Sequence, residues 1–110
     1  MGRYAEDLGA FSVDTEGTIF MASPRTLEMT GYDLWDLLGQ PFAGYIAEDS
    51  LNAAMENFSK TLAGEQTDVL LGIRRKDGSI LRVRARSAPD KDGEQIVGAV
   101  GTLEEVEPGS

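Results

Sequence analysis

Residues 67–103 read "TDVLLGIRRKDGSILRVRARSAPDKDGEQIVGAVGTL", and apolar and polar side chains alternate along much of this stretch. A period of two residues is typical of strands that have one buried face. The alternation stops at Asp77-Gly78 and around Asp92-Gly93, and Asp-Gly pairs favour tight turns between antiparallel strands. The stretch therefore predicts three strands that are joined as an antiparallel meander.

One face of the middle predicted strand is basic, because Arg82, Arg84 and Arg86 occupy alternate positions. The other face is formed by Leu81, Val83, Ala85 and Ser87. The neighbours of the arginines depend on the first turn, since one extra turn residue exchanges the two faces of a strand. A turn of two or four residues places three apolar residues beside the arginines, and a three-residue turn reverses this parity. Those residues are Val69, Leu71 and Ile73.

The chain before residue 67 is expected to begin with strands and to continue as helices. Residues 11–23 predict two short strands around a turn at Glu16-Gly17. Ser23 is a good N-cap for a short helix that ends at Gly31, and residues 33–39 repeat this pattern. Residues 48–64 form the longest predicted helix, because their apolar residues fall on one stripe. The stripe consists of Leu51, Ala54, Met55, Phe58 and Leu62.

Together these elements predict an α+β fold, a five-stranded antiparallel sheet with short helices and one longer helix on one face. A chain of 110 residues is long enough to form one such core. The domain is expected to span residues 10–105. Residues 1–9 are interpreted as a flanking helix or tether, and residues 106–110 as a C-terminal tether.

The composition excludes several functions. The chain contains no Cys and no His, so it lacks a thiol nucleophile, the commonest metal ligand and the usual acid–base group. We therefore expect no metal site, no catalytic residues and no enzymatic activity. The net charge of −9 argues against nucleic-acid binding, and no run approaches the roughly 18 apolar residues of a membrane helix. The acidity indicates either a soluble cytoplasmic domain or adaptation to high salt.

The order of several short motifs resembles the PAS domain family. The motifs are a D-x-x-G turn, a helix between S-P and T-G-Y, L-L-G, E-D before the long helix, R-K-D-G-S in the hairpin, and G-x-x-G in the last strand. They lie at Asp14 and Gly17, Ser23-Pro24, Thr30-Gly31-Tyr32, Leu37-Leu38-Gly39, Glu48-Asp49, Arg75 to Ser79, and Gly98 with Gly101. The family often has Asn at the position of Ser23. It commonly has D-I-T where residues 102–107 read "TLEEVE".

The resemblance implies a module of a larger prokaryotic signalling protein, such as a histidine kinase of a two-component system, a chemotaxis transducer or a transcriptional regulator. PAS domains hold ligands between the sheet and the helices, and they commonly pair through the outer sheet face and an N-terminal helix. The chain is therefore interpreted as a domain that senses a small ligand. The alternative is a dimerisation module without a ligand. The effector domain of the parent chain is the other expected partner.

The residues expected around a ligand would also form the core of a ligand-free domain, whose side chains fill the cavity. They are Met29, Thr30, Phe42, Tyr45, Met55, Phe58, Val83, Ala85 and Ser87. Thr30, Tyr45 and Ser87 are the polar groups among them that can orient a ligand. Without Cys and His, neither a covalent flavin nor haem is expected. A noncovalent flavin, stacked on Trp35 and Tyr45, and a small apolar ligand both stay open.

The arginine row has two interpretations. Its charges can prevent edge-to-edge pairing while the side-chain stems cover the strand, or they can dock acidic segments of this chain or of a second copy. The last predicted strand is apolar on both faces, which favours docking because its outer face would then be covered. The expected interface of a homodimer consists of Tyr4, Leu8, Val69, Leu71, Ile73, Arg82, Arg84, Arg86 and Val97.

Overall fold

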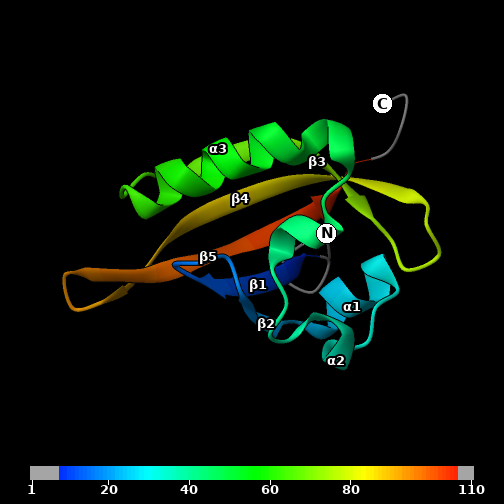
Figure 1. Cartoon of the computed structure of the whole chain (residues 1–110), viewed down its shortest axis with the longest axis horizontal. Helices are drawn as coiled ribbons and strands as arrows, with labels where there is room; N and C mark the ends of the chain where they lie inside the picture. The colour runs from blue at the N-terminus through cyan, green and yellow to red at the C-terminus, as the bar shows by residue number, and fades with distance from the viewer. Residues whose placement is uncertain (1–7, 107–110) are drawn as a thin grey trace, which may run out of the picture.

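The computed structural model describes residues 8–106 of the chain. Its strands are β1 (Gly9–Asp14), β2 (Ile19–Ala22), β3 (Thr67–Arg74), β4 (Ile80–Asp92) and β5 (Gln95–Glu105). They form one five-stranded sheet in the order β2-β1-β5-β4-β3, and every neighbouring pair is antiparallel (Figure 1). The N-terminal hairpin therefore extends the C-terminal meander at β5, and the predicted sheet is confirmed.

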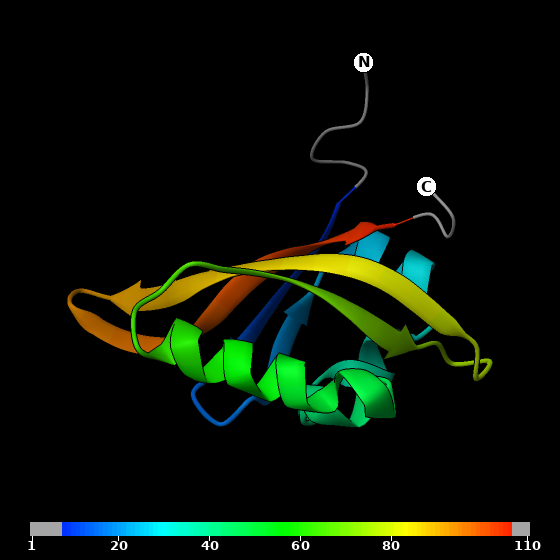
Figure 2. The ribbon, with the colours of Figure 1, turned by 90° about the horizontal axis from the view of Figure 1, so that it is seen from above.

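The segment between β2 and β3 is helical. It contains α1 (Pro24–Thr30), α2 (Leu34–Leu37), the 3₁₀ turns η2 (Phe42–Tyr45) and η3 (Glu48–Ser50), and α3 (Leu51–Leu62). Helix α3 runs along the sheet beside β3 and β4, whereas α1 and α2 lie near β1 and β2 (Figures 1 and 2). Within residues 8–106, no helix combines the length and the apolar character that crossing a membrane requires.

Helix α1 is fixed to β1 by hydroxyl groups in its first turn. Ser23 Oγ accepts hydrogen bonds from the N–H of Thr26 (3.4 Å) and of Ala10 (2.9 Å). Thr26 Oγ1 donates to the carbonyl of Ala10 at 2.9 Å. Gly31 ends the helix with φ of 81°, a conformation that glycine adopts without strain. The predicted N-cap and helix end are both confirmed, and the cap also joins the helix to the sheet.

We expect Ser23→Ala to lower the free energy of unfolding by about 1–3 kcal/mol, because it removes a cap and leaves the Ala10 N–H without its acceptor. Urea denaturation followed by circular dichroism measures this change. Ser23→Asp keeps a side-chain acceptor at the N-cap and is the matched control, with a smaller expected loss. Equal stability of Ser23→Ala and the wild type would contradict the role assigned to this hydroxyl.

The turn between β3 and β4 sets which residues of β3 face the core. It spans residues 75–79, an odd number, and the resulting register pairs Leu71 with Val83 and Leu70 with Arg84. Val69, Leu71 and Ile73 therefore lie on the core face of the sheet and not beside the arginines. This odd-numbered turn gives the same parity as the three-residue alternative, and not that of a turn of two or four residues.

Helix α3 presents a different face to the core from the predicted stripe. Ala54 is buried and Phe58 is partly buried, but Met55 is 43% exposed and Thr61 is 1% exposed. Thr61 Oγ1 donates to the carbonyl of Asn57 at 2.9 Å, so its hydroxyl is satisfied within the helix. A threonine can therefore take the inner position that the sequence assigned to apolar residues, and the predicted burial of Met55 is wrong.

Candidate ligand cavity between the sheet and the helices

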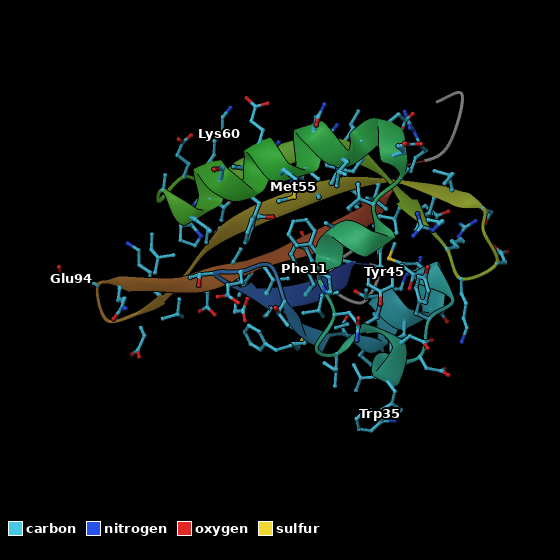
Figure 3. The ribbon with its side chains drawn as sticks, viewed as in Figure 1. Phe11, Trp35, Tyr45, Met55, Lys60 and Glu94 are labelled. Carbon is cyan, nitrogen blue, oxygen red and sulfur yellow. The ribbon has the colours of Figure 1, made fainter. Side chains whose placement is uncertain are left out.

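A cavity of about 130 Å³ lies between the inner face of the sheet and the helical segment. All five strands and α1, α2, η2 and α3 contribute side chains to its wall. Phe11 lies on the floor from β1, and Ala54 and Phe58 face it from α3. Figure 3 shows Phe11 at the centre of the molecule, whereas Trp35 extends outward from α2 and is 83% exposed.

The wall of the cavity carries no charged side chain, since none of its lining residues is Asp, Glu, Lys or Arg. An ion buried there would lose its hydration without gaining a partner of opposite charge, and such transfers are strongly unfavourable. The cavity is therefore suited to neutral molecules.

The hydroxyl groups of the wall are mostly engaged with the backbone. Thr26, Thr30, Tyr32, Tyr45 and Thr61 each donate to a backbone carbonyl. Burial, with smaller contributions from Tyr32 and Asp36, raises the pKa of Tyr45 above its ordinary value of 10.0, so this phenol remains a donor at neutral pH. These five groups hold the wall together and have no hydrogen to offer a ligand.

Two aromatic pairs stiffen the helical side of the cavity. The rings of Phe42 and Phe58 meet edge to face, with centroids 5.1 Å apart, and those of Tyr32 and Tyr45 meet in the same way at 5.0 Å. Such pairs stabilise packing by about 0.5–1.5 kcal/mol beyond the area that they bury. They join α3 to η2, and η2 to the segment between α1 and α2.

A family model described as "PAS fold" matches residues 19–103 of the chain. The chain belongs to the PAS-fold family. The matched residues contain β2 to β4, most of β5 and all the helices, so they include most of the cavity wall. The resemblance read from the ordered sequence motifs is therefore confirmed. No curated protein sequence matches the chain.

Solved structures show the same fold at low sequence identity. The PAS-B domain of Drosophila melanogaster Cycle, with bound ethylene glycol, has a TM-score of 0.82 and 18% identity over 89% of this chain and 99% of that one. A PAS domain of a Colwellia psychrerythraea protein has a TM-score of 0.82 and 18% identity, over 90% and 86%. A Rhodobacter sphaeroides LOV protein has a TM-score of 0.80 and 19% identity, over 94% and 61%.

The structure brings six of the nine predicted ligand contacts of the PAS domain to the cavity wall. These are Thr30, Phe42, Tyr45, Phe58, Ala85 and Ser87. Met29 and Val83 are buried in the adjoining core but do not line the cavity, and Met55 is exposed on the outer side of α3. Phe11 and Thr61 line the cavity but were not among the predicted contacts. Alternation along β1 could have placed Phe11 inside, whereas Thr61 carried no apolar signal.

The hairpin between β3 and β4 clamps the helical side of this PAS domain. Lys76 Nζ lies 3.0 Å from Asp36 Oδ2, and the Lys76 N–H donates to the carbonyl of Thr30 at 3.1 Å. Tyr32 donates its hydroxyl to the carbonyl of Arg74 at 2.8 Å. The backbone N–H of Asp33, and then Lys76, hold the pKa of Asp36 below its ordinary value of 3.8. The ionised Asp36 therefore stabilises both the start of α2 and the hairpin contact.

This contact predicts a dependence of stability on pH. The folded state binds the Asp36 proton more weakly than the unfolded chain, so the stabilisation is complete above pH 3.8 and is lost as the pH falls through the lower folded pKa. When the pH is lowered from about 5 to about 2, we expect the free energy of unfolding to fall less in Asp36→Asn than in the wild type. Urea denaturation over this range measures it, with Asp92→Asn as the control of equal charge. An equally steep decline in Asp36→Asn and the wild type would refute the contact.

The arginine row lies on the outer face of the sheet, as predicted, but two of its members are paired within the domain. Arg84 and Arg86 contact Asp68 at 2.9 Å and 3.3 Å, and Arg86 also lies 3.7 Å from Glu104. The hydrogen bond from Arg84 is the main cause of a lowered pKa at Asp68. Exposed pairs of this kind contribute little to stability individually, because solvent screens them. The row therefore cross-links β3, β4 and β5.

The remaining predicted interface residues are placed differently. Tyr4 lies outside residues 8–106, as does most of the expected flanking helix, and Leu8 is partly buried just before β1. Val97 is 37% exposed at a bulge, where the pairing of Asp90 with Gly98 is followed by that of Lys91 with Ile96. Val97 therefore has no cross-strand partner in β4, and its place in a dimer interface stays a prediction.

Strand β5 of the PAS domain ends in an ion-pair cluster. Glu105 lies 3.7 Å from Arg25 of α1 and 3.9 Å from Arg75 of the hairpin. Arg75 Nε also donates to the carbonyl of Met29 at 3.1 Å. The described part of this segment, residues 102–106, is therefore tied to the helical side through Glu105.

Proposed function

We propose that this PAS domain is a cytoplasmic sensory module that binds a small neutral ligand in its inner cavity. The observation that carries the proposal is an uncharged cavity whose wall hydroxyls, with one exception, donate to the backbone. Its parent is proposed to be a prokaryotic signalling protein, such as a histidine kinase, a transducer or a regulator. The proposal includes no catalytic step, since the cavity wall offers neither a carboxylate nor an amine.

The size of the cavity limits the ligand. In another protein, an engineered apolar cavity of about 150 Å³ stays dry and binds benzene. A cavity of about 130 Å³ is therefore matched to a single small ring or a short chain. A flavin ring system is larger than this space, and Trp35, which was expected to stack on it, faces solvent. We propose that the ligand is neither a flavin nor haem.

Ligand binding to the folded state predicts a higher melting temperature. Benzene at ten times its dissociation constant would stabilise the domain by about 1.4 kcal/mol, which corresponds to about 5–10 °C for a domain of this size. Differential scanning fluorimetry over a benzene series measures this shift. Cyclohexane and toluene test the size limit, and an absorbance scan of the purified protein tests for a coloured cofactor. No stabilisation by any of the three probes would refute the proposal.

A second candidate function is self-association through the outer face of the sheet. The observation that favours it is the exposure of large apolar side chains on this face, where Leu70 is 55% exposed and Met21 is 38% exposed. We expect Leu70→Ser to lower the weight-averaged sedimentation coefficient at a fixed concentration, because it removes apolar area from the interface. Met55→Ser changes a similarly exposed residue on α3 and is the control. An unchanged profile in Leu70→Ser would remove this candidate.

A further inference from the structure

Ser87 differs from the other hydroxyl groups of the cavity wall. It lies on β4, two residues beyond the buried Ala85, and its cross-strand neighbours are Thr67 of β3 and Gly101 of β5. Five other hydroxyls of the wall donate to backbone carbonyls. Among the hydroxyls that line the cavity, Ser87 alone makes no hydrogen bond within the described residues. Its donor and acceptor are both available to a bound molecule.

The neighbours of Ser87 explain why its hydroxyl stays free. Thr67 Oγ1 already pairs with Thr61 Oγ1 at 3.1 Å, across the gap between β3 and α3. Gly101 has no side chain, and a Cβ placed there would lie 2.7 Å from the ring of Phe11. The absence of a side chain at Gly101 therefore lets the Phe11 ring pack across β5. Thr67 therefore uses its own hydrogen on Thr61, Gly101 has no side-chain polar group, and neither strand neighbour makes a hydrogen bond with the Ser87 hydroxyl within the described residues.

We infer that Ser87 recognises the single polar group of the ligand, so that the cavity takes a small amphipathic molecule with one hydroxyl on an apolar body. This inference rests on the proposed function and narrows its ligand class. A second hydrogen-bond acceptor on the ligand, such as a carbonyl oxygen, would find no free donor in the wall and would be buried unpaired, which is unfavourable. A charged group would find no counter-ion. Phenol and short monohydric alcohols have the required chemistry.

Benzene and phenol are matched probes for this inference, because they differ by one hydroxyl. Binding transfers the phenol hydroxyl out of water, and the free-energy cost of this dehydration is the same for every variant. The change in the ratio of the two dissociation constants between variants therefore reports the contact with Ser87 alone. A net hydrogen bond corresponds to about a twofold to tenfold change in affinity.

The experiment titrates both probes into the wild type, Ser87→Ala and Ser87→Thr, followed by two-dimensional NMR. We expect Ser87→Ala to weaken phenol about threefold to tenfold and to leave benzene within about twofold. Ser87→Thr keeps the hydroxyl on a residue that suits a strand, and it is expected to retain the affinity for phenol. Ser59→Ala, on the exposed side of α3, is the control for loss of a serine hydroxyl elsewhere.

The outcomes separate this inference from the proposed function. If benzene binds the wild type and Ser87→Ala leaves the ratio unchanged, the role of Ser87 is overturned while the ligand cavity stands. The same follows if Ser87→Ala weakens both probes equally. If neither probe binds the wild type, the proposed function fails, and the inference fails with it.

Discussion

Gly98→Ala is expected to lower the free energy of unfolding by about 3 kcal/mol, because a methyl group at this position meets the backbone of the neighbouring strand. A Cβ on Gly98 would lie 2.1 Å from the carbonyl oxygen of Val13 and 3.0 Å from the Cα of Asp14. Both atoms belong to β1, which pairs with β5 at this point. A flexible side chain could move aside, but here two strands of the sheet must separate.

Thermal unfolding measures the effect, and a loss of this size corresponds to a fall of about 12–24 °C in the melting temperature of a domain with up to about 100 ordered residues. Gly44→Ala is the matched control, since nothing lies within 4 Å of a Cβ there and the backbone is not left-handed. It is expected to change stability by less than about 0.5 kcal/mol. Similar melting temperatures for the two variants would show that β1 and β5 do not approach as closely as described.

Ala54→Leu is expected to abolish ligand binding without unfolding the domain. Ala54 is 4% exposed, lies near the start of α3 and forms part of the cavity wall. The three added carbon atoms would occupy the space that a small ring needs. Filling a cavity commonly raises the free energy of unfolding by about 0.5–2 kcal/mol, so a native or higher melting temperature is expected.

We expect the affinity of Ala54→Leu for benzene to fall more than tenfold, since a filled cavity has no room for the ring. Calorimetric titration measures it. Ala63→Leu makes the same change at an exposed position just beyond α3, and it is expected to bind as the wild type does. Unchanged binding by Ala54→Leu would place the ligand somewhere other than this cavity.

The parts of the fold that short-range chemistry determines were predictable from the sequence. Ser23 and Gly31 bound α1 because a side-chain acceptor and a left-handed backbone are each required locally. Asp77 accepts the N–H of Ser79 at 2.9 Å, and Gly78 has φ of 92°, as an Asp-Gly turn requires. Alternation placed the arginines on the outer face.

The parts that depend on long-range packing were not predictable. One residue more or less in the turn after β3 exchanges the faces of the strand, and no local signal sets that number. On α3, Thr61 is buried, because a carbonyl of its own helix accepts the hydrogen bond from its hydroxyl. Met55 is exposed instead. Strand β4 continues through Pro89 to Asp92, although alternation weakens there, because β5 pairs with it.

In the candidate site, too, the features set by local sequence were predictable and those set by long-range packing were not. Alternation on β4 correctly placed Ala85 and Ser87 inside. The capping signals of α1 correctly predicted the helix end at which Thr30 reaches the wall. The free hydroxyl of Ser87 could not be foreseen, because it depends on which carbonyls the other hydroxyls reach across the fold.

We propose that a small neutral ligand binds between the sheet and α3. Nuclear Overhauser effects between benzene protons and assigned methyl groups would locate such a ligand. We predict contacts to the methyl groups of Ala54, Ala85 and Leu103, which line the cavity, and none to Leu70 on the outer face. Contacts to Leu70 without contacts to Ala54 or Ala85 would contradict the claim.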